Sequence, residues 1–328
     1  MRFTRGLAGK GIALLAGAVL ATTLSGADGA SAADKLRVGK GVPFAFTFVP
    51  MEVGVAAGIW AKHGIEPEIY GFGGAARQQQ ALVAGSIDIG LGSGPSMGFA
   101  VKGVPAVGIA AFAGPPRSLA VVVLPNSPIK TSDHLKGRTI GITTAGSLTD
   151  WLSKRISLSK GWGVDGIKPV ALGGLEPSLA ALKTNQVDSL MLATEVGYLL
   201  EKKNEARIVV GVGEFVKDFH THVMFAQNSL IKEKPELVQR FVNAWFETVA
   251  YMKANKAFSV DVATKALRQD RDIMARTYDE EMPMMSDDGV FDPKAVAVIK
   301  ASLVEMKILD SIPKDEQMFT TRFVPPKR

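Results

Sequence analysis

The alternation of short apolar segments with helix-forming segments, between residues 36 and 193, most constrains the fold of this chain. The apolar segments are strand candidates, and they cover residues 36–39, 65–72, 87–91, 107–112, 119–124, 138–143, 167–172 and 187–193. Helix candidates cover residues 75–84, 147–158 and 177–184. Short apolar strands separated by helices of about 10 residues predict βαβ units and mostly parallel sheets. We therefore expect an α/β fold.

The apolar period changes from Pro235 onward. Apolar residues then recur at helical spacing, at Leu237, Phe241, Val242, Trp245, Val249 and Met252. A further helix is expected over residues 295–308, because Asp292 and Pro293 supply an N-cap followed by proline at the first helical position. No strand is expected after Ser229. We expect this helical tail to serve packing and the ligand chemistry to lie in the α/β portion.

The first 32 residues are typical of a cleaved export signal. Residues 1–10 carry three positive charges and no acid, residues 11–24 are apolar and uncharged, and Ala30-Ser31-Ala32 offers small residues for a signal peptidase. A bilayer span needs about 20 apolar residues, so this run is too short. A buried N-terminal helix is the alternative. Without a cysteine at the cleavage point for a lipid anchor, we expect a soluble protein exported to the periplasm.

Composition excludes several classes of function. Residues 1–32 carry three positive charges and one negative charge, so the net charge of +6 falls to +4 without them. The remaining basic residues are scattered and aromatic residues make up only 7%, which argues against nucleic-acid binding. The chain has no cysteine, which excludes disulfides, Cys-ligated zinc, iron–sulfur clusters and thiol nucleophiles.

Three loops rich in Gly, Ser and Thr each end a predicted strand and open a predicted helix. They cover residues 71–76, 92–96 and 143–149. Each presents backbone N–H groups and a positive helix end at the carboxyl edge of a strand, where open α/β sheets bind ligands. Any one loop is weak evidence, because every strand-to-helix turn needs a cap. Three loops from two separate predicted sheets indicate an anionic or polar ligand held between two lobes.

Two short motifs suggest other chemistry. Residues 94–98 fit the G-x-S-x-G pattern of a secreted serine esterase with Ser96 as nucleophile, but such a triad needs a histidine far downstream, and the last 106 residues contain none. His220 and His222 could hold a metal on one strand face, yet no third ligand lies nearby in the sequence. We expect no catalytic residue, no metal and no cofactor.

Three segments carry a family resemblance. The run LVAGSIDIGLGSGPSMGFAVKG begins at residue 82, FAGPPRSLAVVVLPNSPIKTSDHLKGRTIGITTAGS begins at residue 112, and PELVQRFVNAWFETVAYMKAN begins at residue 235. Together they resemble the substrate-binding proteins of ABC importers, in the nitrate/sulfonate/taurine-type cluster that is similar in fold to NMT1/THI5-like proteins. The resemblance covers residues 36–309.

The resemblance implies a type II periplasmic-binding-protein fold, with two α/β lobes joined by two hinge strands. Residues 119–126 would cross outward and residues 222–228 would return. Lobe one would hold residues 34–122 plus 226–328, and lobe two residues 123–225.

The resemblance also implies a function. A monomer would capture a small polar or anionic organic solute, such as a sulfonate or carboxylate, and deliver it to the membrane permease of an ABC importer. The alternative on the same fold is a pyrimidine-synthesis enzyme of the THI5 type. Those enzymes are cytosolic, so the predicted export signal argues against that reading.

Position within the fold gives the expected ligand-binding residues. They are Thr47 and Phe48 after the first strand, Gly74, Ala75, Ser93, Gly94 and Ser96 in lobe one, and Thr144, Gly146, Ser147, Thr149, Thr194 and Glu195 in lobe two. Sulfonate-type relatives often carry an aromatic or Asp-Pro-Tyr pattern where this chain has Thr-Glu-Val-Gly-Tyr. Glu195 facing the cleft would repel a strong anion; it could equally lie beside a helix N-cap. Arg117 could reach a carboxylate or lie on the surface.

Overall fold

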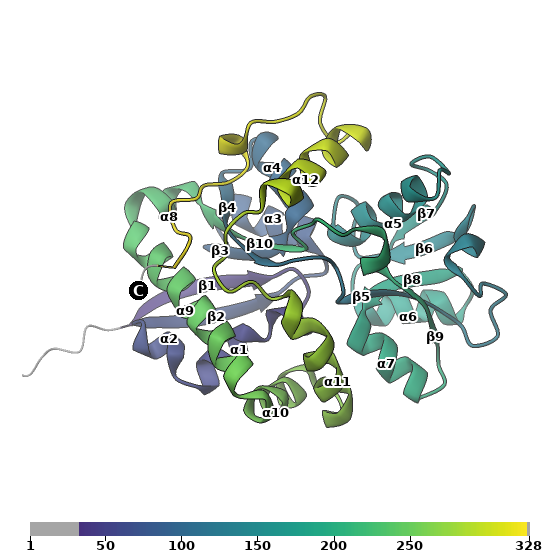
Figure 1. Cartoon of the computed structure of the whole chain (residues 1–328), viewed down its shortest axis with the longest axis horizontal. Helices are drawn as coiled ribbons and strands as arrows, with labels where there is room; N and C mark the ends of the chain where they lie inside the picture. The colour runs from purple at the N-terminus through teal and green to yellow at the C-terminus, as the bar shows by residue number, and fades with distance from the viewer. Residues whose placement is uncertain (1–32, 327–328) are drawn as a thin grey trace, which may run out of the picture. The chain divides into compact units, whose positions relative to one another are not determined.

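Two five-stranded sheets form the framework of the computed structural model, which describes residues 33–326 (Figure 1). The first sheet has the order β2 (Ile65–Gly71), β1 (Asp34–Lys40), β3 (Ile89–Ser93), β10 (His222–Gln227), β4 (Ala106–Ala113). The second has the order β7 (Lys168–Ala171), β6 (Thr139–Ile142), β8 (Ser189–Ala193), β5 (Leu119–Val123), β9 (Arg207–Gly211). The expected α/β class is confirmed.

One strand in each sheet runs against its neighbours. β10 pairs antiparallel with β3 and β4, and β5 pairs antiparallel with β8 and β9, whereas the remaining pairings are parallel. These are the two strands at which the chain passes from one sheet to the other. The division into lobes at residues 122 and 225 stays a prediction; strand pairing favours boundaries just before β5 and just before β10.

Helices connect the strands and make up the tail. They are α1 (Pro50–Ala56), α2 (Ile59–Lys62), α3 (Ala75–Val83), α4 (Met97–Val101), α5 (Leu148–Ser159), α6 (Leu175–Lys183), α7 (Thr194–Lys202), α8 (Asn228–Glu233), α9 (Pro235–Ala254), α10 (Lys256–Leu267), α11 (Arg271–Glu281) and α12 (Pro293–Glu305). Within residues 33–326 no strand follows β10, as the sequence predicts. No helix in that range combines the length and apolar character needed to cross a bilayer. The predicted export signal lies outside the described residues.

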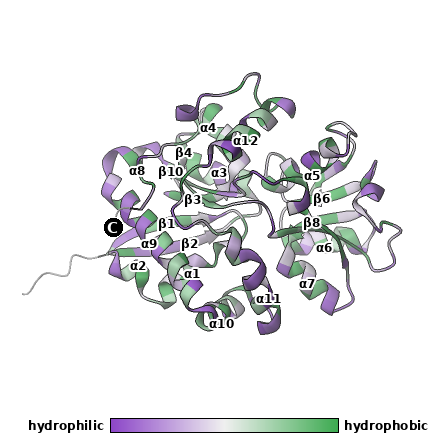
Figure 2. Cartoon of the chain, in the orientation of Figure 1, coloured by the Kyte–Doolittle hydropathy of each residue, from purple (hydrophilic) through white to green (hydrophobic). Residues whose placement is uncertain are grey.

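The tail packs through the apolar stripe of α9. Phe241 stacks on Trp60 of α2 with ring centroids 5.0 Å apart, and Trp245 meets Phe112 of β4 edge-on at 4.8 Å. Figure 2 shows hydrophobic residues in many of the strands and hydrophilic residues along much of α11. The start of α12 is as predicted, because the Asp292 side chain accepts a hydrogen bond from the Lys294 amide at 2.8 Å.

The tail also contacts helices of the second sheet. The Trp151 indole on α5 donates a hydrogen bond to the Ser302 hydroxyl on α12 at 2.9 Å. On α11, the Arg276 guanidinium lies 3.5 Å from the centre of the Tyr198 ring on α7. Residues that follow the return strand β10 therefore hold both sheets in one arrangement.

Candidate functional site

A cavity lies where the two sheets face each other. The volume open to the centres of water molecules is about 80 Å³, and one water needs roughly 10–15 Å³ on this measure. The cavity therefore suits a small solute. Its lining comprises Gly41, Val42, Phe44, Ala45, Thr47, Phe48, Gly74, Ala75, Gly92, Ser93, Ser118, Leu119, Ile142, Thr143, Ser147, Leu148, Thr149, Gly173, Gly174, Leu175, Ser178, Leu190, Met191, Leu192, Ala193 and His222.

Strand direction explains why these residues meet. In each sheet the parallel strands end at the edge that faces the cavity, so β3, β6 and β8 end in the lining at Ser93, Ile142 and Ala193. β5 and β10 run the opposite way, so their first residues, Leu119 and His222, lie at the cavity edge of their own sheets.

Four helices begin at the cavity. The N-cap residues of α3, α5, α6 and α7 are Gly74, Ser147, Gly174 and Ala193; all four line the cavity, and none of their side chains caps its own helix. No N-cap side chain accepts a hydrogen bond from its own helix, although the Ala76 N–H of α3 donates to the Ser147 hydroxyl, and the positive ends of four helix dipoles converge. Such an arrangement stabilises an anion or a strong hydrogen-bond acceptor.

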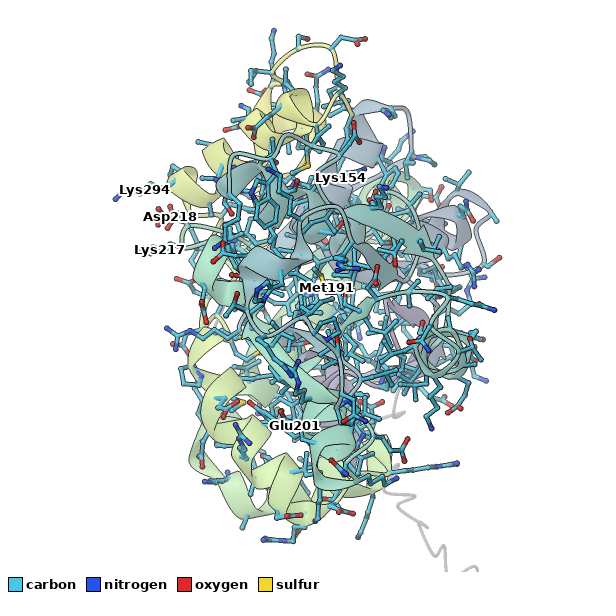
Figure 3. All side chains as sticks on the ribbon, turned by 90° about the vertical axis from the view of Figure 1, so that its right-hand side faces the viewer. Lys154, Met191, Glu201, Lys217, Asp218 and Lys294 are labelled. Carbon is cyan, nitrogen blue, oxygen red and sulfur yellow. The ribbon has the colours of Figure 1, made fainter. Side chains whose placement is uncertain are left out.

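The side chains of the lining are uncharged. They are hydroxyls, aliphatic and aromatic groups, and one imidazole, with no Asp, Glu, Lys or Arg among them. Met191, one of the apolar lining residues, lies in the middle of the view in Figure 3, whereas Lys217, Asp218 and Lys294 project at its edge. An anion here would be held by backbone amides and hydroxyls without a salt bridge.

His222 forms a neutral, fixed wall of the cavity. Its Nδ1 lies 3.0 Å from the Gly92 carbonyl, which can only accept, so Nδ1–H donates. Burial lowers the His222 pKa to about 4, which leaves Nε2 unprotonated at neutral pH to accept from the Thr47 hydroxyl at 3.2 Å. The ring stacks on Phe112 and meets the Phe48 edge. His222 therefore holds Thr47 and Phe48 in place.

Loops from the two sheets touch beside the cavity. The Ala76 amide donates a hydrogen bond to the Ser147 hydroxyl at 3.1 Å. Gly74 has φ 125°, and a Cβ at this position would lie 2.7 to 2.8 Å from the hydroxyl oxygens of Thr143, Thr144 and Ser147. Only glycine permits this approach. The structure therefore holds the two sheets drawn together over the cavity.

Seven of the thirteen residues predicted to bind ligand line the cavity. They are Thr47, Phe48, Gly74, Ala75, Ser93, Ser147 and Thr149. The Thr149 hydroxyl also accepts a hydrogen bond from the Thr143 amide at 3.0 Å, so it braces its own loop as well. Their role in binding stays a prediction.

The other six predicted residues lie outside the lining. Gly94 packs against the His220 backbone, and the Thr144 hydroxyl pairs with the Ser147 hydroxyl. The Gly146 amide donates a hydrogen bond to the Asp150 carboxylate at 2.8 Å. The Thr194 hydroxyl donates a hydrogen bond to the Arg117 carbonyl at 3.2 Å. Ser96 is fully buried and its hydroxyl pairs with Ser93 at 2.8 Å. Because no histidine partners Ser96, the residues of an esterase triad are not assembled here.

Glu195 is not part of the cavity lining. Its Oε1 accepts a hydrogen bond from the Phe46 amide at 2.7 Å, and the side chain is fully buried. The carboxyl group therefore does not oppose an anion in the way a lining residue would. Arg117 is exposed and also lies outside the lining.

His220 and His222 do not form a metal pair. The His220 ring accepts a hydrogen bond from the Asp292 amide at 2.9 Å, while the His222 ring is hydrogen-bonded to the Gly92 carbonyl and the Thr47 hydroxyl. No group of three or more His, Cys, Asp or Glu side chains suited to a metal occurs in the described part of the chain.

Sequence reasoning missed a fourth loop and the histidine. Gly173, Gly174, Leu175 and Ser178 line the cavity at the start of α6, and Gly173-Gly174 follows a strand in the same way as the three predicted loops. That pattern could have identified it. His222 offered no comparable signal, because its hydrogen-bond partners are distant in sequence.

Comparisons with solved structures agree with this architecture. The ligand-binding component of an ABC-type import system from Staphylococcus aureus has a TM-score of 0.74 at 15% identity, over 88% of this chain and 97% of that one. The alkanesulfonate-binding protein SsuA from Xanthomonas axonopodis pv. citri, bound to MOPS, has a TM-score of 0.72 at 17% identity, over 85% and 94%. SsuA from Escherichia coli has a TM-score of 0.69 at 19% identity, over 87% and 92%. The periplasmic-binding-protein fold is thereby confirmed.

Comparisons by sequence give the family. Proteins of Brucella abortus and Brucella suis that carry the name binding protein are 28% identical over 225 residues, which is 65% of this chain. The match spans 66% of the length of these curated relatives. A family model described as NMT1/THI5 like matches residues 45–257, well over half of the sequence, and the chain belongs to this family.

Proposed function

We propose that this protein captures a small organic solute with an anionic or strongly hydrogen-bond-accepting head and delivers it to the membrane permease of an ABC importer. One observation carries the proposal: four helices begin at a single cavity whose lining has no charged side chain, and none of the four is capped by its own N-cap side chain. Helix N-termini favour a negative head group. The apolar lining favours a carbon body attached to it.

The named relatives support this class of ligand. The SsuA proteins from Xanthomonas and Escherichia coli are named for binding alkanesulfonates and aliphatic sulphonates, and the Brucella relatives are named binding proteins. A sulfonate or carboxylate also matches the cavity, because each carries one charge that backbone amides and hydroxyls could share. The sulfonate stays compatible with this chain because Glu195 is not part of the lining.

A few hydrogen bonds to the head group would suffice for useful affinity. A micromolar dissociation constant corresponds to about −8 kcal/mol. Hydrogen bonds to a charged group contribute about 1.5–3 kcal/mol each, so several amide and hydroxyl donors with apolar contact reach this value. The solute would touch both sheets only when they are drawn together, so binding would favour closure by hinge motion at β5 and β10.

Delivery to a permease requires the protein outside the cytoplasm. The predicted signal segment over residues 1–32 supports export to the periplasm. We propose that the exported protein acts as a soluble monomer.

Binding is favoured over catalysis on this fold. The desulfurization enzyme DSZB is also similar, with a TM-score of 0.60 at 16% identity. In the present cavity, however, Ser93 pairs with Ser96, and both ring nitrogens of His222 are occupied by Gly92 and Thr47. The described lining does hold one hydroxyl–imidazole pair, Thr47 and His222, but burial lowers the His222 pKa to about 4, which makes this imidazole a weak general base at neutral pH.

A ligand screen tests the proposal. The protein is purified from the periplasm of a bacterial host, and native mass spectrometry is used to detect a co-purified solute. Thermal unfolding is then measured with ethanesulfonate, benzenesulfonate, nitrate, benzoate and pyrimidines. At least one organic anion is expected to raise the midpoint by mass action. Turnover of any of these compounds, or stabilisation by none of them, would contradict the proposal.

A further inference from the structure

Two buried glutamates lie on helices that pack against each other and belong to opposite sides of the cavity. Glu195 lies in the first turn of α7, which follows β8 of the second sheet, and Glu281 is the last residue of α11, in the tail beyond β10 of the first sheet. α7 and α11 pack against each other (Figure 1). The two side chains are 0% and 1% exposed, so both carboxyl groups are removed from water.

Hydrogen bonding to this pair is incomplete. Glu195 Oε1 accepts from the Phe46 amide, but Glu195 Oε2 and both Glu281 oxygens have no hydrogen-bond partner among the described residues. A buried carboxylate without a partner is strongly destabilised, and two adjacent carboxylates also repel each other. A proton held between the two groups would convert one of them into a donor and give an unpartnered oxygen a hydrogen bond.

The charged groups around the pair are engaged elsewhere. No salt bridge in residues 33–326 includes Glu195 or Glu281. Arg276 and the Tyr198 hydroxyl both bind Glu280. Lys202 pairs with Asp270 and Asp272, and Lys256 pairs with Asp279 and lies over the Tyr278 ring. Glu201 accepts a hydrogen bond from the Ile208 amide. The remaining neighbour, Glu280, adds negative charge. Protonation is therefore the available way to neutralise the pair.

The electrostatics agree with this geometry. Burial raises the pKa of Glu195 to about 7. Burial also raises the pKa of Glu281 well above its ordinary value, and the charges of Glu195 and Glu280 raise it further. The closed pair accordingly holds a proton near neutral pH.

Glu195 is connected directly to the cavity. Its hydrogen-bond donor, the Phe46 amide, begins the short helical segment Phe46–Phe48, and the next two residues, Thr47 and Phe48, line the cavity. The Phe46 ring packs edge-on against Tyr278 of α11, with centroids 6.2 Å apart. A change in the carboxylate pair would therefore reach the two lining residues through one turn of backbone.

We propose that Glu195 and Glu281 share one proton when the two sheets close, and that Glu195 is thereby a pH-sensitive positioning residue for solute binding, acting through Phe46. The proposal rests on the solute-binding function inferred above. Separation of the sheets would hydrate the pair and release the proton. Closure then takes up a proton, and rising pH opposes both closure and solute binding.

The first test needs no ligand. Thermal unfolding of the ligand-free protein is followed from pH 5.5 to 8.5 for the wild type, for Glu281→Gln, and for the exposed control Glu316→Gln. Glutamine at position 281 can donate permanently to Glu195, so this variant is expected to match the wild type at pH 5.5 and to exceed its midpoint by several degrees at pH 8.5. Subtracting the two curves removes the contribution of the buried histidines. Glu316→Gln is expected to follow the wild type throughout.

This test decides whether Glu195 and Glu281 share a proton. A constant difference between the wild type and Glu281→Gln across the pH range would overturn the shared proton. If Glu281→Gln does not fold, Glu195→Gln provides the same comparison, because its amide can donate to Glu281. Loss of pH dependence in Glu316→Gln as well would also count against the pair.

The second test connects the pair to the cavity. Calorimetric titration with ethanesulfonate, which does not itself titrate in this range, is performed at pH 6 and pH 8. A pKa of about 7 for Glu195 in the closed form predicts about tenfold weaker binding at pH 8 than at pH 6 for the wild type. Less than a twofold change is expected for Glu281→Gln. Equal affinity of the wild type at both pH values would overturn the positioning role. Absence of any binding would count against the proposed ligand class, while the ligand-free unfolding curves still decide the shared proton.

Discussion

The amide of Ala76 donates a hydrogen bond to the hydroxyl of Ser147 at 3.1 Å, and this bond joins the loop after β2 to the loop after β6. The two residues lie at the starts of α3 and α5, helices that follow strands of different sheets. Both helices begin at the cavity, so the contact that closes the site also aligns two of its helix N-termini. The following predictions depend on this relationship.

Gly74→Ala is expected to hold the sheets apart. The added Cβ would lie within 2.7 to 2.8 Å of three hydroxyl oxygens, and φ 125° is strained for alanine. We expect solute affinity to fall at least tenfold, measured by calorimetry, and the ligand-free protein to become larger in small-angle scattering. Gly103→Ala is the matched control: its φ is also positive, at 92°, but nothing lies within 4 Å. Equal effects from both substitutions would assign the change to backbone strain alone.

Ser147→Ala is expected to weaken closure with little effect on folding. It removes one hydrogen bond between the sheets, which contributes about 1 kcal/mol, so affinity should fall about fivefold. Ser159→Ala, at the other end of α5, loses a hydroxyl bonded only to its own helix and should bind as the wild type does. Unchanged affinity in Ser147→Ala would show that this contact does not support the bound state.

Ser178→Asp is expected to abolish binding of an anion. Ser178 lines the cavity in the first turn of α6, where its hydroxyl donates to the Gly174 carbonyl at 2.8 Å. A carboxylate here would neutralise the positive end of the α6 dipole and would repel the anionic head group of a ligand. Ser178→Asn has a similar size without the charge and should retain most of the affinity. If ethanesulfonate binds both variants equally in calorimetry, the helix ends do not hold the charged group.

His222→Gln is expected to reduce sensitivity to acid. The folded protein keeps His222 neutral with a pKa of about 4, below the ordinary 6.5, so the unfolded chain binds more protons between these values. The stability that this histidine contributes is complete above pH 6.5 and is lost as pH falls through 4, on the order of 3 kcal/mol. Urea unfolding at pH 7 and pH 4.5 should therefore show a smaller loss in His222→Gln. An equal loss in both proteins would mean that His222 does not titrate as described.

Local patterns in the sequence predicted most of the architecture. The loop that ends at Ser147 was predictable because glycine, hydroxyl residues and a following helix former are contiguous in sequence. β9 (Arg207–Gly211) was missed: its five residues lie at the edge of the second sheet, paired with β5 more than 80 positions earlier, and nothing local specifies that pairing. Helices α10 and α11 were likewise not predicted individually.

The orientation of site residues depended on distant contacts. The position of Glu195 after β8 predicts a residue of the cleft, yet its carboxylate accepts a hydrogen bond from the Phe46 amide, 149 residues earlier in the chain. His222 faces Gly92 across the antiparallel pairing of β10 with β3, which the sequence does not reveal. Neither orientation follows from the periodicity or composition of its own segment.

The central claim is that four helix N-termini hold an anionic head group in a cavity without charged side chains. Calorimetric titration of the purified protein with ethanesulfonate and with ethylammonium, which carry opposite charges on the same two-carbon chain, tests it most directly. The account predicts one-to-one binding of ethanesulfonate in the micromolar range and no measurable binding of ethylammonium. Tighter binding of ethylammonium, or equal binding of both, would contradict it.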